Sequence, residues 1–181
     1  MPPRAYIIRT DGACRGNPGP ASIGVALYDA ESHGSDDPDA IPVASISAAI
    51  GTTTNNVAEW RAVIAAIDFA AELGAREIDL LLDSKLVVEQ LQGRWRVRDA
   101  KLAPLCDEAL KGLTRFAHWG AAMCRASRMV AQMLSPMRRL IVLCAVVPLG
   151  WRDGRTIAEL LQTQPPLAQS RPQPQRRASP Y

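Results

Sequence analysis

The chain has 181 residues, 48% of them hydrophobic, so it can bury one core of ordinary size, and one domain with extensions is expected. Its four cysteines form no CxxC pair, which excludes the usual metal-ligand spacings; with no signal peptide, they favour reduced thiols in a cytoplasmic protein. The longest apolar run, residues 140–149, contains Pro148 and is too short to span a bilayer, so we expect no membrane association.

The net charge of +3 is distributed unevenly along the chain. Residues 1–113 carry 11 lysines and arginines against 16 aspartates and glutamates, whereas residues 114–181 carry 10 against 2. Such a break in composition predicts a boundary near Leu113. We expect an ordered domain over 1–113, an atypical segment over 114–161, and a disordered tail rich in proline, glutamine and arginine over 162–181.

The beginning of the chain predicts three antiparallel strands. Residues 5–13 and 21–29 read as two strands, and the turn-rich CRGNPGP between them predicts a hairpin. After a polar, acidic loop, PVASISAAIG at residues 42–51 predicts the third strand.

The next part of the chain predicts a helix, a buried strand and two further helices. From TTTNN onward, apolar residues recur at helical spacing until Gly74, a natural helix stop. EIDLLLD, residues 77–83, is short and strongly apolar, which is typical of a strand buried on both faces. Residues 84–93 and 101–113 predict two helices separated by the basic RWRVRD. The expected order is therefore β-β-β-α-β-α-α.

Three acidic residues lie where this pattern changes. Asp11 lies inside the first strand, Glu59 in the first turn of the first helix, and Asp83 at the end of the buried strand. Acids on neighbouring strands, and on a helix packed against them, can converge. Convergent carboxylates repel one another unless a cation joins them, and such oxygen ligands suit Mg²⁺ or Mn²⁺.

Each of these acids also has a purely structural interpretation. Asp83, before Ser84, is a possible helix N-cap, and Glu59 in a first turn is favourable to the helix dipole. Asp11 is harder to interpret in this way, because an unpaired carboxylate within a buried strand is costly. The glycines of GACRGNPGP are those that a hairpin turn needs, and they do not form a GxxxxGK[ST] phosphate loop.

Three stretches of the chain together resemble a known family. TDGACRGNPGPASIGVAL, TTTNNVAEWRAVIAAI and LLLDSKLVVEQLQG are similar to the three successive motifs of type 1 ribonuclease H, in the short bacterial form without the basic handle. The resemblance covers roughly residues 5–113. It implies an α/β fold with a ribonuclease H-like mixed sheet, in which three antiparallel strands precede β-α-β, with helices on both faces. It also implies Mg²⁺-dependent endonucleolytic cleavage of the RNA strand in RNA–DNA hybrids.

The resemblance assigns roles to particular residues. Asp11, Glu59 and Asp83 match the first three metal-binding carboxylates of the family, which implies two-metal hydrolysis with two Mg²⁺ or Mn²⁺ ions.

Further matches concern nucleic-acid binding. Asn17, Asn56 and Gln90 match polar positions that touch the hybrid in its minor groove, where the 2′-hydroxyl distinguishes RNA from DNA. Trp95 and Arg96 either contact the DNA strand or belong to a solvated basic connector. The expected partner is an RNA–DNA hybrid, and we expect the protein to be a monomer.

The chain departs from the family pattern after residue 113. The family has a fifth strand that ends in a phrase such as HVPRExN and a last helix that begins ADxLAN, whose aspartate is the fourth metal ligand. Neither is readable in residues 114–181. We therefore expect the fifth strand and the last helix to be lost or replaced, and hybrid cleavage to be impaired.

A shift of reading frame accounts for this departure. If MCRASRMVAQMLSPMR is read one base back, with permitted third bases, it becomes HVPREPNGRADALANE. This predicts a frameshift between about Leu113 and Met123.

Two alternatives to a frameshift stay open for residues 114–181. The segment can instead be a genuine Met-rich helix, or Glu159 or Asp153 can substitute for the missing aspartate. The alternative function is a hybrid-binding module without catalysis, or a non-functional frameshifted product.

Overall fold

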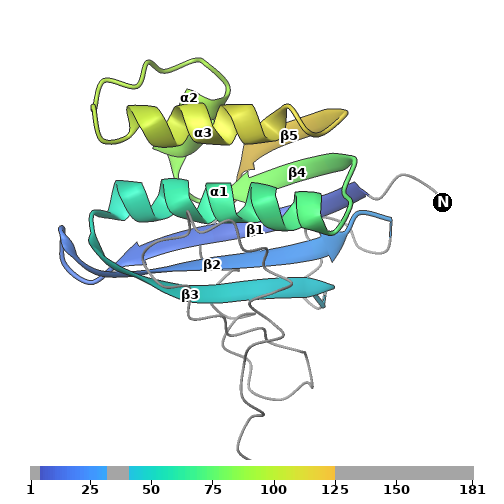
Figure 1. Ribbon diagram of the computed structural model, residues 1–181, viewed down its shortest axis with the longest axis horizontal. Coiled ribbons are helices and arrows are strands. Elements are labelled where there is room, and N and C mark those ends of the chain that lie inside the picture. The colour runs from blue at the N-terminus through green and yellow to red at the C-terminus, as the bar shows by residue number, and fades with distance from the viewer. Residues whose placement is uncertain (1–4, 32–40, 125–181) are drawn as a thin grey trace, which may run out of the picture.

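A computed structural model describes residues 5–31 and 41–124 of the chain. Within them, strands and helices follow one another in the predicted order, and a fifth strand comes at the end (Figure 1). The elements are β1 (Ala5–Cys14), β2 (Gly19–Asp29), β3 (Ala44–Thr53), α1 (Asn55–Glu72), β4 (Glu77–Leu82), α2 (Lys85–Leu91), α3 (Ala103–Leu113) and β5 (His118–Met123).

The strands form one mixed sheet in the order β3-β2-β1-β4-β5. β1, β2 and β3 pair as an antiparallel meander, whereas β4 and β5 run parallel to β1. A parallel pair needs a crossover connection, and α1 provides it between β3 and β4. The ribonuclease H-like mixed sheet expected from the sequence is therefore present.

The core lies between the sheet and its helices. α1 packs against β1 and β2, and α3 packs against α1 (Figure 1). Trp60 of α1 and Ile8 and Leu80 of the sheet are fully buried in this core. The two helices approach closely because Gly112 has no side chain: a Cβ there would lie 2.8 Å from Cγ2 of Ile67. This packing fixes α1, which carries one of the three acids, against the sheet.

All three described helices share the core on one face of the sheet. The opposite face carries Ile7, Ala26 and Tyr28, because successive strand residues point to opposite faces. The resemblance implies helices on both faces, and the last helix of that pattern falls outside residues 5–31 and 41–124. Among the helices of these residues, none is both long enough and apolar enough to cross a membrane.

The fifth strand corrects one expectation from the sequence. β5 pairs with β4 from His118 through Met123, so a fifth strand is present in the chain as written. The ordered sheet also extends past Leu113, where the charge pattern predicted a boundary. β5 forms because β4 has a second edge of backbone groups to satisfy, and because Ala121 is small enough to be buried against the helix-bearing core.

Candidate functional site

The three acids singled out in the sequence meet at one end of the sheet. Asp11 follows Thr10, which pairs with Leu82 of β4, and Asp83 follows Leu82 directly. Glu59 reaches the same place from the second turn of α1, not from the first turn as predicted, because the helix begins at Asn55 and has no acid in its first turn. One carboxylate oxygen from each acid lies within 4.8 Å of the others. Among residues 5–31 and 41–124, this is the one group of three potential metal ligands that comes so close together.

Gly12 sets the position of Glu59. A Cβ on Gly12 would lie 2.3 Å from the backbone nitrogen of Glu59 and 2.4 Å from the carbonyl carbon of Ala58. No real side chain fits at such distances, so α1 can rest on β1 only where the strand has glycine. The backbone N–H of Gly12 also donates a hydrogen bond to the Glu59 carboxylate. The residue after Asp11 thus holds the second acid beside the first.

The three carboxylates of the cluster repel one another when they are charged. The pKa of Glu59 is raised from 4.5 to about 8, first by burial and then by the negative charges of Asp83 and Asp11. Burial and the charge of Asp83 raise the pKa of Asp11, and burial raises the pKa of Asp83. One carboxylate oxygen of Asp83 is buried and has no hydrogen-bond partner among the described residues. Convergent, desolvated oxygens of this kind fit a divalent cation, which would remove the repulsion.

The loop between β1 and β2 is tied to the beginning of α1. The side-chain oxygen of Asn17 accepts a hydrogen bond from the backbone N–H of Asn55, at 3.2 Å. Asn55 in turn directs its amide toward Oε1 of Glu59, at 3.5 Å. The thiol of Cys14 lies within donating distance of the carbonyl oxygens of Gly16, at 2.6 Å, and Thr53, at 3.0 Å, and its one proton serves one of them at a time. Among residues 5–31 and 41–124, nothing accepts a hydrogen bond from the amide NH₂ group of Asn17, which leaves this group for an external partner.

The other predicted nucleic-acid residues have different surroundings. Asn56 is exposed at the beginning of α1, and it follows Asn55, whose backbone N–H donates to Asn17. Gln90 is only 8% exposed, and its side-chain oxygen is buried without a partner among the described residues, so it offers little surface to a hybrid. The family resemblance assigned Gln90 to the minor groove; its side chain lies mostly inside the protein, and its contact with a hybrid stays a prediction.

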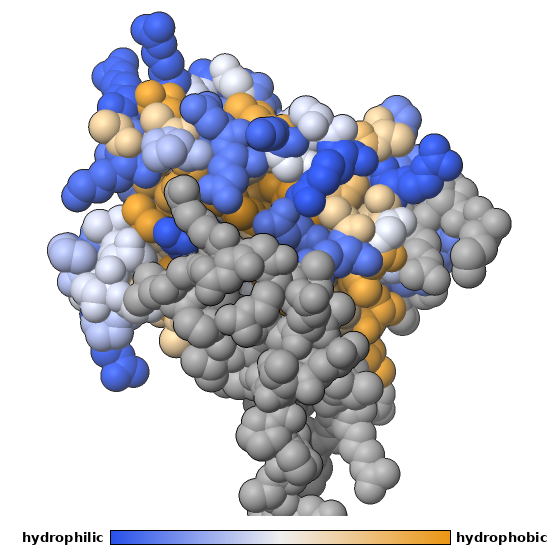
Figure 2. Space-filling model, in the orientation of Figure 1, coloured by the Kyte–Doolittle hydropathy of each residue, from blue (hydrophilic) through white to orange (hydrophobic). Residues whose placement is uncertain are grey.

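The connector between α2 and α3 is exposed and basic. Trp95 is 46% exposed, and the Lys85 ammonium lies 5.7 Å from the centre of its ring. Arg96 is exposed beside it. In the space-filling view, hydrophilic side chains gather over this connector, at the upper left (Figure 2). An aromatic ring among cations is a surface that suits a nucleic-acid strand.

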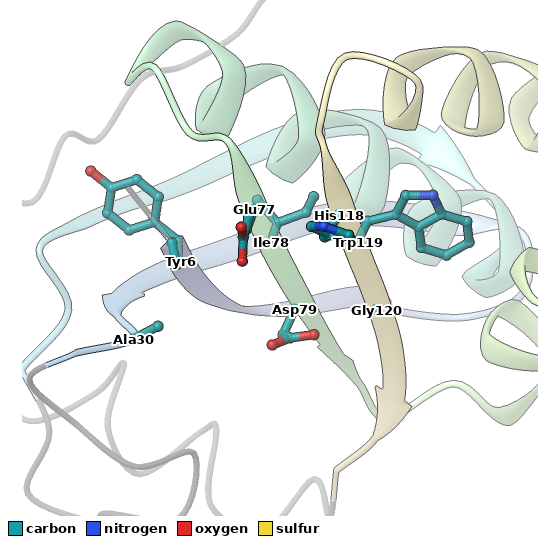
Figure 3. Close-up of a pocket in the computed structure, with 9 residues that line it drawn as sticks. Tyr6, Ala30, Glu77, Ile78, Asp79, His118, Trp119 and Gly120 are labelled. Carbon is teal, nitrogen blue, oxygen red and sulfur yellow. The ribbon is translucent and has the colours of Figure 1, made fainter. Parts of the chain in front are cut away.

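A hollow lies where the parallel strands β1, β4 and β5 begin (Figure 3). Tyr6, Glu77 and Asp79 line it from β1 and β4, and His118 and Trp119 line it from β5. Its acids and histidine do not bring three ligand atoms within 4.8 Å of one another, as Asp11, Glu59 and Asp83 do. We therefore place the candidate site at the other end of the sheet.

Two residues near the acids were not singled out by the sequence. Asn55 had been noted only as part of a capping run. Cys124 follows β5, and its backbone N–H donates to the Leu82 carbonyl, at 2.8 Å. Burial raises the pKa of the Cys124 thiol, Arg9 lowers it, and the charges of Asp83 and Asp11 raise it. β5 runs parallel to β4, so its end must lie near Asp83. A prediction of this pairing from the sequence would therefore have placed Cys124 near the acids.

The mixed sheet with three acids where β1, β4 and α1 meet defines a ribonuclease H-like domain. A family model described as reverse transcriptase-like matches residues 9–135, which is more than half of the chain. The chain belongs to this family.

Two curated relatives are similar to part of this chain. The bifunctional protein Rv2228c of Mycobacterium tuberculosis is 46% identical over 103 residues, which are 57% of this chain and 26% of that protein. Ribonuclease HI of Halobacterium salinarum is 42% identical over 109 residues, which are 60% of this chain and 51% of that enzyme. The chain thus spans about a quarter of one relative and about half of the other.

Solved structures agree with this likeness. The N-terminal RNase H domain of Rv2228c, solved as a fusion with maltose binding protein, has a TM-score of 0.62 at 40% identity, covering 68% of this chain and 89% of that one. LC11-RNase H1, solved in complex with an RNA/DNA hybrid, has a TM-score of 0.60 at 32% identity, covering 68% of this chain and 87% of that one.

Proposed function

We propose that this chain is a ribonuclease H that binds RNA–DNA hybrids and hydrolyses the RNA strand with divalent cations. The observation that carries the proposal is the convergence of Asp11, Glu59 and Asp83 within 4.8 Å. The names of the relatives support it, as does the neighbouring RNase H1 that was solved with a hybrid. We propose that the protein acts as a cytoplasmic monomer.

Asp11, Glu59 and Asp83 would hold the cations, with Mg²⁺ or Mn²⁺ favoured by an all-oxygen ligand set. Two such ions, when bound, would supply activation of a water for in-line attack and stabilisation of the leaving oxygen. The role of the protein is to hold the carboxylates in place. Gly12 and Asn55 hydrogen-bond to Glu59 and keep it directed at the other two.

The exposed polar residues around the acids would hold the hybrid. Asn17 and Asn56 lie by the beginning of α1 and are proposed to read the minor groove, where the 2′-hydroxyl marks the RNA strand. Trp95 and Arg96 are proposed to support the DNA strand through stacking and charge. Gln90 matches a minor-groove position of the family, and its burial restricts it to a place behind that surface.

Binding without efficient cleavage is the second candidate. The group of acids within residues 5–31 and 41–124 has three members, whereas the family pattern has a fourth aspartate. With fewer carboxylates, the cations would be held more weakly. A hybrid-binding module with impaired cleavage follows from the same surface, and the two candidates differ in turnover rather than in affinity.

The test is cleavage and binding of labelled RNA–DNA hybrid in Mg²⁺ or Mn²⁺, beside double-stranded DNA and single-stranded RNA. Asp11→Asn and Asp83→Asn should abolish cleavage and weaken Mn²⁺ binding measured by calorimetry. The matched control is Asp79→Asn, which removes an exposed acid in the first half of β4, away from the end that carries Asp83. Cleavage that survives Asp11→Asn would refute the assignment of the site, and hybrid binding with no cleavage would favour the second candidate.

A further inference from the structure

Gln92 forms a link between α2 and the edge of the sheet. It is the C-cap residue of α2, and its side-chain Nε2 donates a hydrogen bond to the backbone oxygen of Ala121 in β5, at 2.5 Å. The two residues are 29 positions apart in the chain, so the bond joins separate elements. α2 is a short helix of seven residues, and this bond at its end adds to the packing of its buried Val88 and Leu91.

The acceptor lies on the open edge of the sheet. β5 is the last strand in the order, and the N–H of Cys124 donates to Leu82 of β4. In a parallel ladder, alternate residues pair with the neighbouring strand. Ala121 is an odd number of positions from Cys124, so its carbonyl points away from β4. Gln92 therefore covers an edge carbonyl that the ladder leaves unpaired.

Arg94 and Trp95 form the first half of the basic connector. Within the described residues, their recorded ion pair, hydrogen bond and ring contact are all with α2. Arg94 forms an ion pair with Glu89, and the backbone N–H of Trp95 donates to the Glu89 carbonyl. The Trp95 ring lies under Lys85, which also belongs to α2. The second half is anchored separately, because Val97 packs against the core. Arg94 and Trp95 must therefore follow any movement of α2.

We propose that Gln92 is a positioning residue for hybrid binding, because it fixes α2, and with it Arg94 and Trp95, relative to the three acids. This inference rests on the proposed function, since it takes the connector as the support of the DNA strand. Without the amide, α2 would stay packed through Val88 and Leu91, which are buried, but its last turn would move more freely. Hybrid affinity would fall while turnover of bound hybrid would not.

The experiment uses the full chain with Gln92→Met and Gln92→Glu, neither of which can donate to Ala121. Glu108→Met, on the exposed face of α3, is the control for the new side chain. We expect KM and the Kd for a fluorescein-labelled hybrid to rise roughly 2- to 10-fold, which is the size of one lost hydrogen bond, with kcat and Tm close to the parent values. Amide hydrogen exchange at residues 93–96 should become faster.

Two results would overturn the proposal. One is a lower Tm in both Gln92 variants with the parent KM, Kd and exchange rates, which would make the bond structural only. The other is no change in any of these measurements. If the parent chain itself neither binds nor cleaves the hybrid, the proposed function fails. The exchange rates then still test whether Gln92 fixes α2 and the connector. Unchanged amide exchange at residues 93–96 in Gln92→Met would refute that role.

Discussion

Replacing Glu59 with glutamine should stabilise the metal-free protein at high pH and weaken its stabilisation by divalent cations. Glu59 is 6% exposed, and its pKa is raised from 4.5 to about 8, chiefly by burial. A carboxyl group with a higher pKa in the folded state binds more protons there than in the unfolded chain. Its contribution to stability is therefore complete below pH 4.5 and is lost as the pH rises to about 8.

The magnitude follows from the size of the pKa change. Each unit is worth about 1.4 kcal/mol, and relaxation of the charged site reduces the full value, so we expect a loss on the order of 2 kcal/mol between about pH 5 and pH 9. The assay is urea unfolding across this range in EDTA, for the parent and for Glu59→Gln, repeated with Mg²⁺. The parent should lose stability with rising pH and regain it with Mg²⁺, whereas both changes should be smaller in the variant, which keeps Asp11 and Asp83. Identical pH slopes for the two proteins in EDTA would refute the reasoning.

Three further predictions concern residues around the site. Gly12→Ala forces α1 away from β1, so it should cost about 1–3 kcal/mol in urea unfolding and weaken Mn²⁺ binding in calorimetry; unchanged Mn²⁺ affinity would contradict the role of this glycine. Cys14→Val removes the donor to the Gly16 and Thr53 carbonyls and should cost about 1 kcal/mol, while Cys14→Ser should retain most of the stability; equal melting curves would argue against a contribution from this thiol. Trp95→Ala should weaken hybrid binding roughly 5- to 100-fold in fluorescence anisotropy, and parent affinity would exclude stacking on this ring.

The convergence of the acids could be predicted because each one lies at a fixed point of a regular element. Asp11 is in a strand with a clear hairpin partner, and Asp83 ends an apolar run of the kind that is buried in parallel sheets. Parallel strands place their ends at the same edge, so proximity follows from topology. What positions Glu59 could not be predicted, because the contact of Gly12 with α1 depends on the packing of a helix on a strand distant in sequence.

β5 and Gln90 show two limits of reading a pattern. HWGAAM has neither β-branched residues nor clear alternation, yet it forms a strand because the edge of β4 gives its backbone partners. Gln90 was matched to the minor groove through the family resemblance alone, and the pattern could not show that α2 buries most of its side chain. In both cases the tertiary neighbours decide, and these are set by elements that lie elsewhere in the chain.

The last prediction concerns the activity of the chain as written. β5 forms in the present frame, so a fifth strand is present, whereas the aspartate of the family's ADxLAN phrase is not readable in residues 114–181. Two Mg²⁺ ions bring four positive charges and the three acids of the cluster return three negative ones, so the ions should be held weakly and their water placed poorly. Small misplacements of reacting groups cost on the order of 100-fold in rate. We expect feeble hybrid cleavage from this chain and strong cleavage from one with the frame restored after about Leu113, lost again on Asp11→Asn. Comparable rates from the two chains, each shown folded by circular dichroism, would refute the frameshift hypothesis and leave Glu159 or Asp153 as the substitute ligand.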